Sequence, residues 1–340
     1  MRNTRLLLAL LLAANTAHVA AAELQAYAGA VGGQASGNGG TFDCATSGPT
    51  IGNGWSAGLS LPTEGIAFCH LTGGVDNQVS SSGPLNASQS VIGPTASGQF
   101  IGAAAARADY GRLGVAASGS KAGATSNFNF DSAAGFARFQ DELILTNPAF
   151  ATGTPASVSF SFHIEGSMSS ASNAPFTQQA DVALGLRVNT GGVFDLFRAT
   201  LINDQLPFVR GGSSGVPGGF IGGPGSLSGA ADITSLFGFD IQWGVPFTLE
   251  VALRTLLNPC CFGTSQTADF FNTARLSGIA VNGPGGPITD FLVSSASGTH
   301  YSAAGVAAVP APGSLAMLAA GLAALGLRRR RARFDCGAIA

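Results

Sequence analysis

Charge is scarce in this sequence. Only 10% of its 340 residues are Asp, Glu, Lys or Arg, whereas about a quarter is usual for a soluble globular protein, and Lys121 is the single lysine. Without residues 1–22 and 313–340, nine basic and seventeen acidic residues remain, a net charge near −8. Such a chain has no basic stripe to neutralise phosphates or hold anionic lipid. The shortage of cations therefore argues against a nucleic-acid-binding protein.

Catalytic groupings are scarce too. His163 stands between serines on the expected solvent face of a strand, where it is an ordinary polar surface residue. Asp141, Glu142 and Asp109 come closest to an acid pair, but neighbours on a strand point to opposite faces, whereas glycoside hydrolysis needs two carboxyls flanking one bond. No His-Glu-x-x-His metal motif is present. We therefore expect no enzymatic activity, no catalytic residue and no cofactor.

Two weak binding signals remain. Asn127, Asn129 and Asp131 alternate along one expected strand face and are, with Asp141, candidate calcium ligands. A solvated polar face is the favoured interpretation, because calcium usually takes about six to eight oxygens, and we predict no metal site. The large aromatic residues are either a platform on which sugars stack or, as we favour, core side chains. They are Tyr27, Trp55, Tyr110, Trp243 and Tyr301.

The N-terminus has the pattern of a secretory signal peptide over residues 1–22. Arg2 and Arg5 provide a positive start, an apolar run follows, and Ala20–Ala22 offers small residues for cleavage before Glu23. The alternative, an uncleaved anchor or a short buried helix, fits less well because the apolar run is too short to span a bilayer. We expect signal peptidase to remove this segment and the body to be exported.

The C-terminus has three parts. A proline motif comes first: Val309, Pro310, Ala311 and Pro312. Residues 313–327 are then apolar without interruption, and as a helix they would reach roughly 22 Å, short of the ~30 Å hydrocarbon core. A cationic cluster follows: Arg328, Arg329, Arg330 and Arg331. Because arginines stay on the cytoplasmic side, we predict a short transmembrane helix that anchors the body transiently in the inner membrane. An ordinary core helix is the alternative, and it would need a polar face that this run lacks.

This arrangement resembles the tripartite PEP-CTERM sorting signal of bacterial surface proteins. The match covers residues 305–331, with weaker likeness at 105–113 and 268–274. In that family exosortase, an integral-membrane enzyme similar to cysteine transpeptidases, recognises and cuts the signal, so the resemblance implies cleavage near the proline motif. The usual motif is Val-Pro-Glu-Pro, and Ala311 here occupies the Glu position, which leaves the subtype of sorting enzyme open. A tail, residues 332–340, also extends beyond the arginines.

Strand patterns dominate the body. In 157–164 the apolar residues Val158, Phe160, Phe162 and Ile164 alternate with serines and His163, which indicates a half-buried strand. The run 182–188 repeats this pattern, and 247–254 alternates apolar residues with Thr248, Glu250, Ala252 and Arg254. We therefore expect antiparallel strands with one solvent-exposed face each. Further candidate strands are 126–130, 138–145, 194–201, 275–281 and 288–294.

The predicted fold is an all-β, antiparallel, jelly-roll-like sandwich. Helical periodicity is weak, 49 glycines disfavour a helix layer, and Phe, with 23 copies, is the expected core filler. We place the sandwich core in residues 100–304 and a Gly-rich region partly packed on it in 23–99. The stretches 28–40 and 211–229 are so rich in glycine that we expect loose order in the first and a long mobile loop in the second.

Four of the five cysteines lie in the expected exported body: Cys44, Cys69, Cys260 and Cys261. An even number in an oxidising compartment favours disulfides, although four cysteines allow three connectivities. We favour Cys44 with Cys69, since both flank a glycine-rich segment that lacks other ties. Cys260 and Cys261 are neighbours whose ring would be strained, so free thiols, other partners and a vicinal bridge stay open.

These patterns together predict an exported, non-enzymatic protein of the cell surface or extracellular matrix. It would be anchored in the inner membrane with its body on the periplasmic side and then released by an exosortase-like enzyme. The family resemblance also implies association with exopolysaccharide or a biofilm matrix. A lectin-like carbohydrate-binding module is the alternative, and a secreted hydrolase ranks third.

Overall fold

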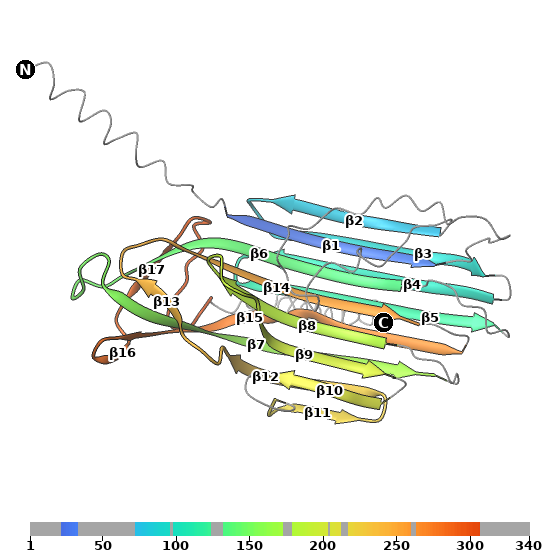
Figure 1. Ribbon diagram of the computed structural model, residues 1–340. Coiled ribbons are helices and arrows are strands. Elements are labelled where there is room, and N and C mark those ends of the chain that lie inside the picture. Colours follow the sequence, from blue (N-terminus) through green and yellow to red (C-terminus); the bar gives the residue numbers. More distant parts are fainter. Residues whose placement is uncertain are drawn as a thin grey trace, which may run out of the picture. The chain divides into compact units, whose positions relative to one another are not determined.

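The fold is an antiparallel all-β sandwich, as predicted. The computed structural model describes residues 22–32, 72–95, 98–123, 132–172, 179–202, 205–211, 217–259 and 263–306. Strands are the only extended regular structure in these ranges, and no helix occurs in them. The strands form two antiparallel sheets packed face to face (Figure 1). We call them sheet A and sheet B.

Sheet A contains eight strands. They are β1 (Glu23–Gly32), β2 (Thr72–Ser80), β6 (Ser132–Thr146), β8 (Gln179–Val188), β9 (Phe194–Ile202), β10 (Gln205–Gly211), β14 (Phe247–Asn258) and β17 (Leu292–Ser295). Their order is β10-β9-β8-β14-β6-β1-β2, and β17 pairs with the end of β6. The central position of β14 and β6 places their side chains deep in the molecule.

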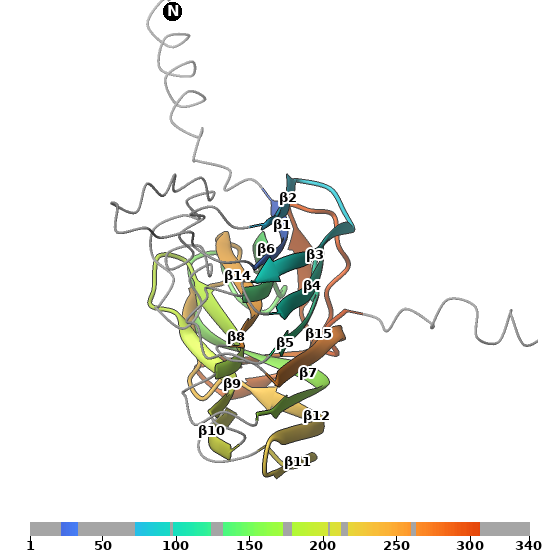
Figure 2. The same cartoon turned by 90° about the vertical axis from the view of Figure 1, so that its right-hand side faces the viewer.

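Sheet B contains nine strands. They are β3 (Leu85–Thr95), β4 (Gly98–Asp109), β5 (Arg112–Gly123), β7 (Pro155–Ala171), β11 (Phe220–Gly223), β12 (Ser226–Thr234), β13 (Phe239–Gln242), β15 (Thr264–Gly283) and β16 (Gly286–Ile288). Their order is β11-β12-β7-β15-β5-β4-β3, with β13 beside β7 and β16 beside β15. The second view shows β3, β4 and β5 on one side of the sandwich and β1, β6 and β14 on the other (Figure 2).

The core lies between the inner faces of the two sheets. In β7 the predicted alternation is confirmed, because Val158, Phe160, Phe162 and Ile164 are at most 1% exposed while His163 stays accessible. Phenylalanine fills much of this space, and burying one such ring stabilises the fold by about 1.5 to 3 kcal/mol. The fully buried phenylalanines of this core are Phe139, Phe160, Phe162, Phe197 and Phe270, and Phe100 and Phe136 are buried in two smaller clusters.

Six of the eight predicted strands lie within observed strands, namely within β6, β7, β8, β9, β14 and β15. The run 288–294 was wrong as one strand, since residues 289–291 separate β16 from β17. Its interruption reflects the change of sheet, because β16 pairs with β15 in sheet B whereas β17 pairs with β6 in sheet A. The run 126–130 lies outside the described residues.

The expected looseness of residues 28–40 was wrong for its first five residues. β1 continues to Gly32 and is paired on both sides, with β2 and with β6. Small residues serve close packing here rather than mobility. At Gly135 of β6, which pairs with Ala28, an added Cβ would lie 2.7 Å from the Ala105 carbonyl oxygen of the opposite sheet.

The mobile loop expected at 211–229 was also wrong over its second half. β11 and β12 form a hairpin there, and Phe220 and Leu227 anchor it with 7% and 1% exposure. Glycine is required at Gly229, whose φ is +148° and whose Cβ would lie 2.1 Å from the Gly219 carbonyl oxygen. The glycine content therefore reflects close backbone approach within a strand pair.

Candidate functional site

The residues predicted for sorting lie outside the described residues, so they stay predictions. They are Val309, Pro310, Ala311, Pro312, Arg328, Arg329, Arg330 and Arg331. The same is true of the disulfide candidates Cys44, Cys69, Cys260 and Cys261. Within the described ranges, no helix is long and apolar enough to cross a membrane, and no group of three metal-binding side chains occurs. The calcium candidates Asn127, Asn129 and Asp131 fall outside those ranges.

The last described segment, residues 296–306, is hydrogen-bonded to the sandwich. Ile279 N donates to Ala303 O (3.0 Å), and Val306 N donates to Leu276 O (3.1 Å). The chain divides into compact units at residues 1–306 and 307–340. Among the described residues, the final backbone bond to the body is thus made three positions before Val309.

Asp141 ties this segment to the core. Its carboxylate is fully buried and accepts hydrogen bonds from Ser297 N (3.0 Å), Ser297 Oγ (2.5 Å) and Tyr301 OH (2.9 Å). Burial raises the pKa of Asp141, while the hydrogen bonds from Ser297 and Tyr301 oppose that rise. Burial and the nearby Asp141 also raise the pKa of Tyr301, which keeps its hydroxyl a donor. The donors to the Asp141 carboxylate all belong to the fold itself, so this carboxylate has a structural role.

This geometry makes a pH prediction. A folded-state pKa above the unfolded value of 3.8 means that the folded protein holds the Asp141 proton more tightly, so stability falls as pH rises through that window. Asp141→Asn removes this titration. The stability of the variant relative to the parent should therefore improve as pH rises from about 3 to about 7, measured by urea unfolding of the full chain. A difference that stays constant or moves the other way contradicts the assignment.

The predicted acid pair is split by its own strand. Asp141 faces the core with 0% exposure, whereas Glu142 lies on the other face of β6 and is half-buried. Asp109 accepts a hydrogen bond from the backbone nitrogen of Tyr110 (2.9 Å) at the turn into β5. His163 lies on the open face of β7, with Nδ1 3.2 Å from an Asp232 oxygen. Asp141 and Glu142 therefore do not flank a common bond.

Four of the large aromatic residues, for which a core position was favoured over a sugar platform, are buried. Tyr27, Tyr110, Trp243 and Tyr301 are at most 7% exposed, and burial raises the pKa of Tyr27 to about 12. The core interpretation is therefore correct for these four, and Trp55 lies outside the described residues. Exposed rings occur elsewhere, at Phe194 (39%) and Phe237 (64%), whose centroids lie 6.5 Å apart. Sequence reasoning missed this pair because it considered only tyrosine and tryptophan.

Strands β8 and β14 of sheet A are buried on both faces, which corrects the expectation of one solvent-exposed face for these two strands. Glu250 and Arg254 of β14 were expected in water but are 2% and 5% exposed, and Ala252 between them is fully buried. They are part of a set of paired charges that we call the arginine–acid face. Its members are Glu23, Arg138, Asp181, Arg187, Arg198, Glu250 and Arg254.

Pairing across neighbouring strands explains how these charges are buried. The Glu250 carboxylate accepts hydrogen bonds from Arg138 Nη1 (2.9 Å) and Arg187 Nε (2.7 Å), and Arg187 lies directly opposite it in the register. Arg138 also binds Glu23 at the start of β1. Opposite charges in hydrogen-bonding geometry offset the cost of removing each from water. These ion pairs therefore give the arginine–acid face a structural role.

Asp181 organises the second half of the arginine–acid face. Its carboxylate binds Arg254 Nη2, Arg198 Nε (3.3 Å) and Thr200 Oγ1 (2.6 Å) and has no exposed area. Thr255 Oγ1 donates to the Asp181 carbonyl oxygen (3.1 Å). Both carboxylate oxygens therefore accept hydrogen bonds within the fold. Asp181 thus positions its neighbours in the sheet and is not a free carboxylate, as a general base would be.

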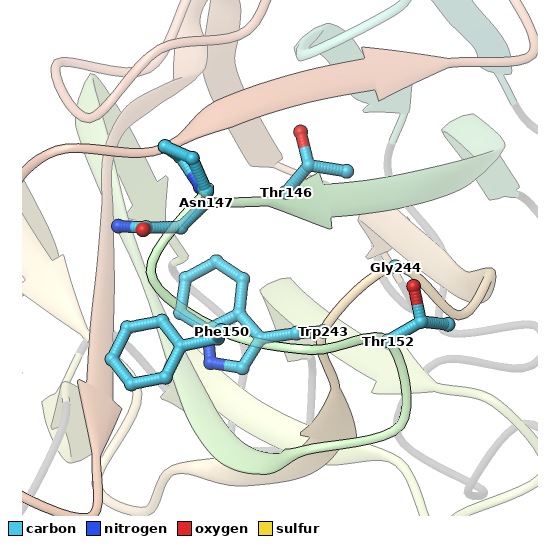
Figure 3. A pocket seen from close by; sticks show the side chains of 7 residues that line it. Thr146, Asn147, Phe150, Thr152, Trp243 and Gly244 are labelled. Atoms are coloured by element: carbon cyan, nitrogen blue, oxygen red, sulfur yellow. The ribbon is translucent and has the colours of Figure 1, made fainter.

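A pocket of about 350 Å³ lies where the end of β6 meets the turn into β14. It is lined by Thr146, Asn147, Pro148, Phe150, Thr152, Trp243 and Gly244. The Phe150 and Trp243 rings stack with centroids 5.2 Å apart and planes 7° from parallel (Figure 3). Trp243 is 1% exposed, and its indole Nε1 is buried with no hydrogen-bond partner among the described residues. Trp243 is thus enclosed by the protein, whereas Phe150 is half-buried.

Backbone hydrogen bonds hold the pocket walls. Trp243 N donates to Thr154 O (3.0 Å), Gly153 N donates to Trp243 O (2.8 Å), and Gly244 N donates to Leu145 O (2.8 Å). The Asn147 side chain accepts from Ala149 N (2.7 Å) and donates to the Asp290 carbonyl. These hydrogen bonds fix the backbone of the pocket walls.

Comparisons with protein-family models, with curated proteins and with solved structures found no match. The function is therefore inferred from the residues of the chain itself. The sequence analysis considered Trp243 only as one of the large aromatic residues. Nothing local in the sequence showed that it meets residues 146–152, about 100 residues earlier in the chain.

Proposed function

We propose that this chain is an exported, non-enzymatic protein of the bacterial cell surface or extracellular matrix. The observation that supports this proposal most directly is where the folded body begins and ends. β1 begins at Glu23, directly after the expected signal peptide, and Val306 makes its final described bond three residues before the proline motif. Cutting at both expected sites would leave every observed strand intact. That is the arrangement that processing at both ends requires.

In this proposal the two ends act in sequence. Signal peptidase removes residues 1–22 after export, and the short apolar helix 313–327 anchors the body on the periplasmic side of the inner membrane. An exosortase-like enzyme then cuts near Pro310–Pro312 and releases the sandwich to the surface or medium. Association with exopolysaccharide follows from the PEP-CTERM resemblance.

The described side chains support a non-enzymatic role. Glu250 and Asp181 are saturated by arginines, and Asp141 is saturated by Ser297 and Tyr301. His163 and Asp232 lie in the open on a sheet face. A hydrolase needs a carboxyl or imidazole placed to reach substrate, and the carboxylates of Glu250, Asp181 and Asp141 are held within the fold instead. The buried aromatic platform likewise gives the lectin-like alternative no support at that position.

Replacing Arg328–Arg331 with glutamine tests the routing. We expect the parent chain to appear outside the cell as a product that starts at Glu23 and ends near the proline motif. The variant should be released more slowly or with a different C-terminus, because nothing then holds the chain for the enzyme. Cell fractionation with intact-mass spectrometry measures both. Arg333→Gln, beyond the cluster, is the matched control and should behave as the parent. Equal release rates and equal masses for parent and cluster variant exclude the proposal.

A further inference from the structure

We infer that Arg107, Arg112 and Arg275 form a binding site for a phosphate or sulfate group. They are three of the nine basic residues between the expected signal peptide and the end of the proline motif. All three are half-buried on the outer face of sheet B, since their neighbours in the chain, such as Leu113 and Ala274, point into the core. The inference goes beyond the export proposal and does not depend on it.

The strand register brings the three arginines together. Arg275 of β15 lies directly opposite Arg112 of β5, and Arg112 lies opposite Asp109 of β4. Arg107 precedes Asp109 on the same face of β4, diagonal to Arg112. Side chains directly opposite on one face have Cβ atoms about 4.5 to 5.5 Å apart, and diagonal ones lie about 7 to 8 Å apart. Three guanidinium groups at these spacings can reach one ligand.

A bulge in β15 places Arg275 opposite Arg112. The register of β15 with β5 shifts between Phe270 and Ala274, and without that shift the ladder would place Thr273 opposite Arg112. Like charges directly opposite each other destabilise a strand pair. The bulge therefore creates a contact that a regular strand would avoid, and bulges often direct a side chain into a functional site.

The group formed by the three arginines and Asp109 has a net positive charge. Burial lowers the pKa of Arg112, and Asp109 opposes this change, whereas Arg107 and Arg275 add to it. One carboxylate is thus set against three guanidinium groups. A ligand with two negative charges would neutralise the four side chains.

Other acids on this face lie farther along the sheet. His163 of β7 is opposite Arg275, and its Nδ1 lies 3.2 Å from an Asp232 oxygen on β12. Glu165 lies two residues farther along β7. Neither acid is directly opposite an arginine in the register, so neither takes the place of the ligand.

The number of donors favours a group with three oxygens. Each guanidinium has five N–H donors, and Arg275 uses Nη1 for the Val306 carbonyl oxygen (3.3 Å). Among the described residues, the Arg107 side chain has no hydrogen bond or ion pair. Arginines from three strands can each bind a different oxygen of a phosphate or sulfate group, whereas a carboxylate offers only two oxygens.

Calorimetric titration with inorganic phosphate tests the site. The protein is the full chain with Arg328–Arg331 replaced by glutamine, so that the C-terminal cluster cannot bind the probe. At pH 8 and low ionic strength, one phosphate should bind per chain with a dissociation constant of about 0.1 to 1 mM. Inorganic sulfate should compete with phosphate, and acetate, a carboxylate, should bind about tenfold more weakly.

Phenyl phosphate, titrated in the same way, distinguishes an ester from a free ion. Tighter binding than that of inorganic phosphate supports a site for a phosphate group carried by a larger molecule. Equal binding supports a site for the free ion. Both results agree with an oxyanion held by the three arginines.

Three variants test which residues hold the anion. Arg107→Gln removes a guanidinium with no partner among the described residues, and phosphate affinity should fall about tenfold. Asp109→Asn removes the opposing charge and keeps an acceptor for Tyr110 N, so affinity should rise about threefold. Arg210→Gln removes the same charge from β10 of sheet A, and this matched control should bind as the parent does.

Three results overturn the inference. The first is no saturable binding at about 20 mM phosphate. The second is equal weakening by Arg107→Gln and Arg210→Gln, which would reflect net charge alone. The third is acetate binding as tight as that of phosphate. Failure here would leave the export proposal standing, because fractionation measures routing, and failure of the arginine-cluster test would leave the phosphate site standing.

Discussion

Replacing Asp181 with alanine is expected to lower the free energy of unfolding by about 3 to 5 kcal/mol. The carboxylate is fully buried and is the shared acceptor for Arg254 Nη2 and Arg198 Nε, with Thr200 as a third donor. Alanine removes that acceptor while the guanidinium of Arg254, 5% exposed, stays within the sheet. A charge kept out of water after losing its counter-ion is the costly state. Chemical denaturation of the full chain measures the loss.

Two controls show that burial causes the effect. Asp232→Ala breaks the exposed pair with His163, and its cost should be within about 0.5 kcal/mol, because solvent screens that interaction. Replacing Asp181 together with its buried partner, Asp181→Leu with Arg254→Met, should recover most of the lost stability, since an apolar pair needs no counter-charge. An Asp181→Ala cost as small as that of Asp232→Ala would refute the role assigned to the arginine–acid face.

Alternation in the sequence correctly indicated which residues share a face. In β7 and β14 the apolar side chains point inward as expected, because a strand reverses its side chains at every residue. The two-residue alternation does not show what packs against the other face of the strand. Glu250 and Arg254 were expected in solvent because they are charged. Only the fold shows that Glu250 lies opposite Arg187 in the register and that Arg254 forms an ion pair with Asp181.

Glycine content was the less reliable guide. Composition does not separate a chain that moves from a backbone that another backbone approaches closely. Gly229 and Gly135 belong to the second kind, since a Cβ at either would meet a carbonyl oxygen at 2.1 Å or 2.7 Å. Both contacts join residues that come together only after the strands pair. The sequence-based expectation of loose loops therefore failed where the fold is most tightly packed.

The candidate sites also differ in how much of each can be predicted from the sequence. The export signals are continuous segments, so their pattern is complete in the sequence. The Phe150–Trp243 pocket needs β13 to pair with β7 before Trp243 reaches Phe150, and the arginine–acid face needs β14 to lie between β6 and β8. Pairing of distant strands depends on the whole core and cannot be read from one segment.

Gly114→Ala is expected to destabilise the sandwich by about 3 kcal/mol or more. Gly114 lies opposite a bulge in β15, where the register shifts between Phe270 and Ala274. A Cβ at this position would lie 1.6 Å from the Phe271 carbonyl oxygen, an obstacle in the backbone that no side-chain rotation relieves. Either the bulge moves or β5 loses its pairing with β15. The melting temperature should fall by about 6 to 12 °C in a thermal scan of the full chain.

The matched control is Gly192→Ala in the turn before β9. Its Cβ would meet no atom within 4 Å, so this substitution should leave stability unchanged or raise it by up to about 1 kcal/mol through a less flexible unfolded chain. Both variants add one methyl group and remove one glycine, and they differ only in what the methyl meets. If the two melting temperatures agree, the β15 bulge adapts to the extra carbon, and the tight contact with β5 is not what holds these strands together.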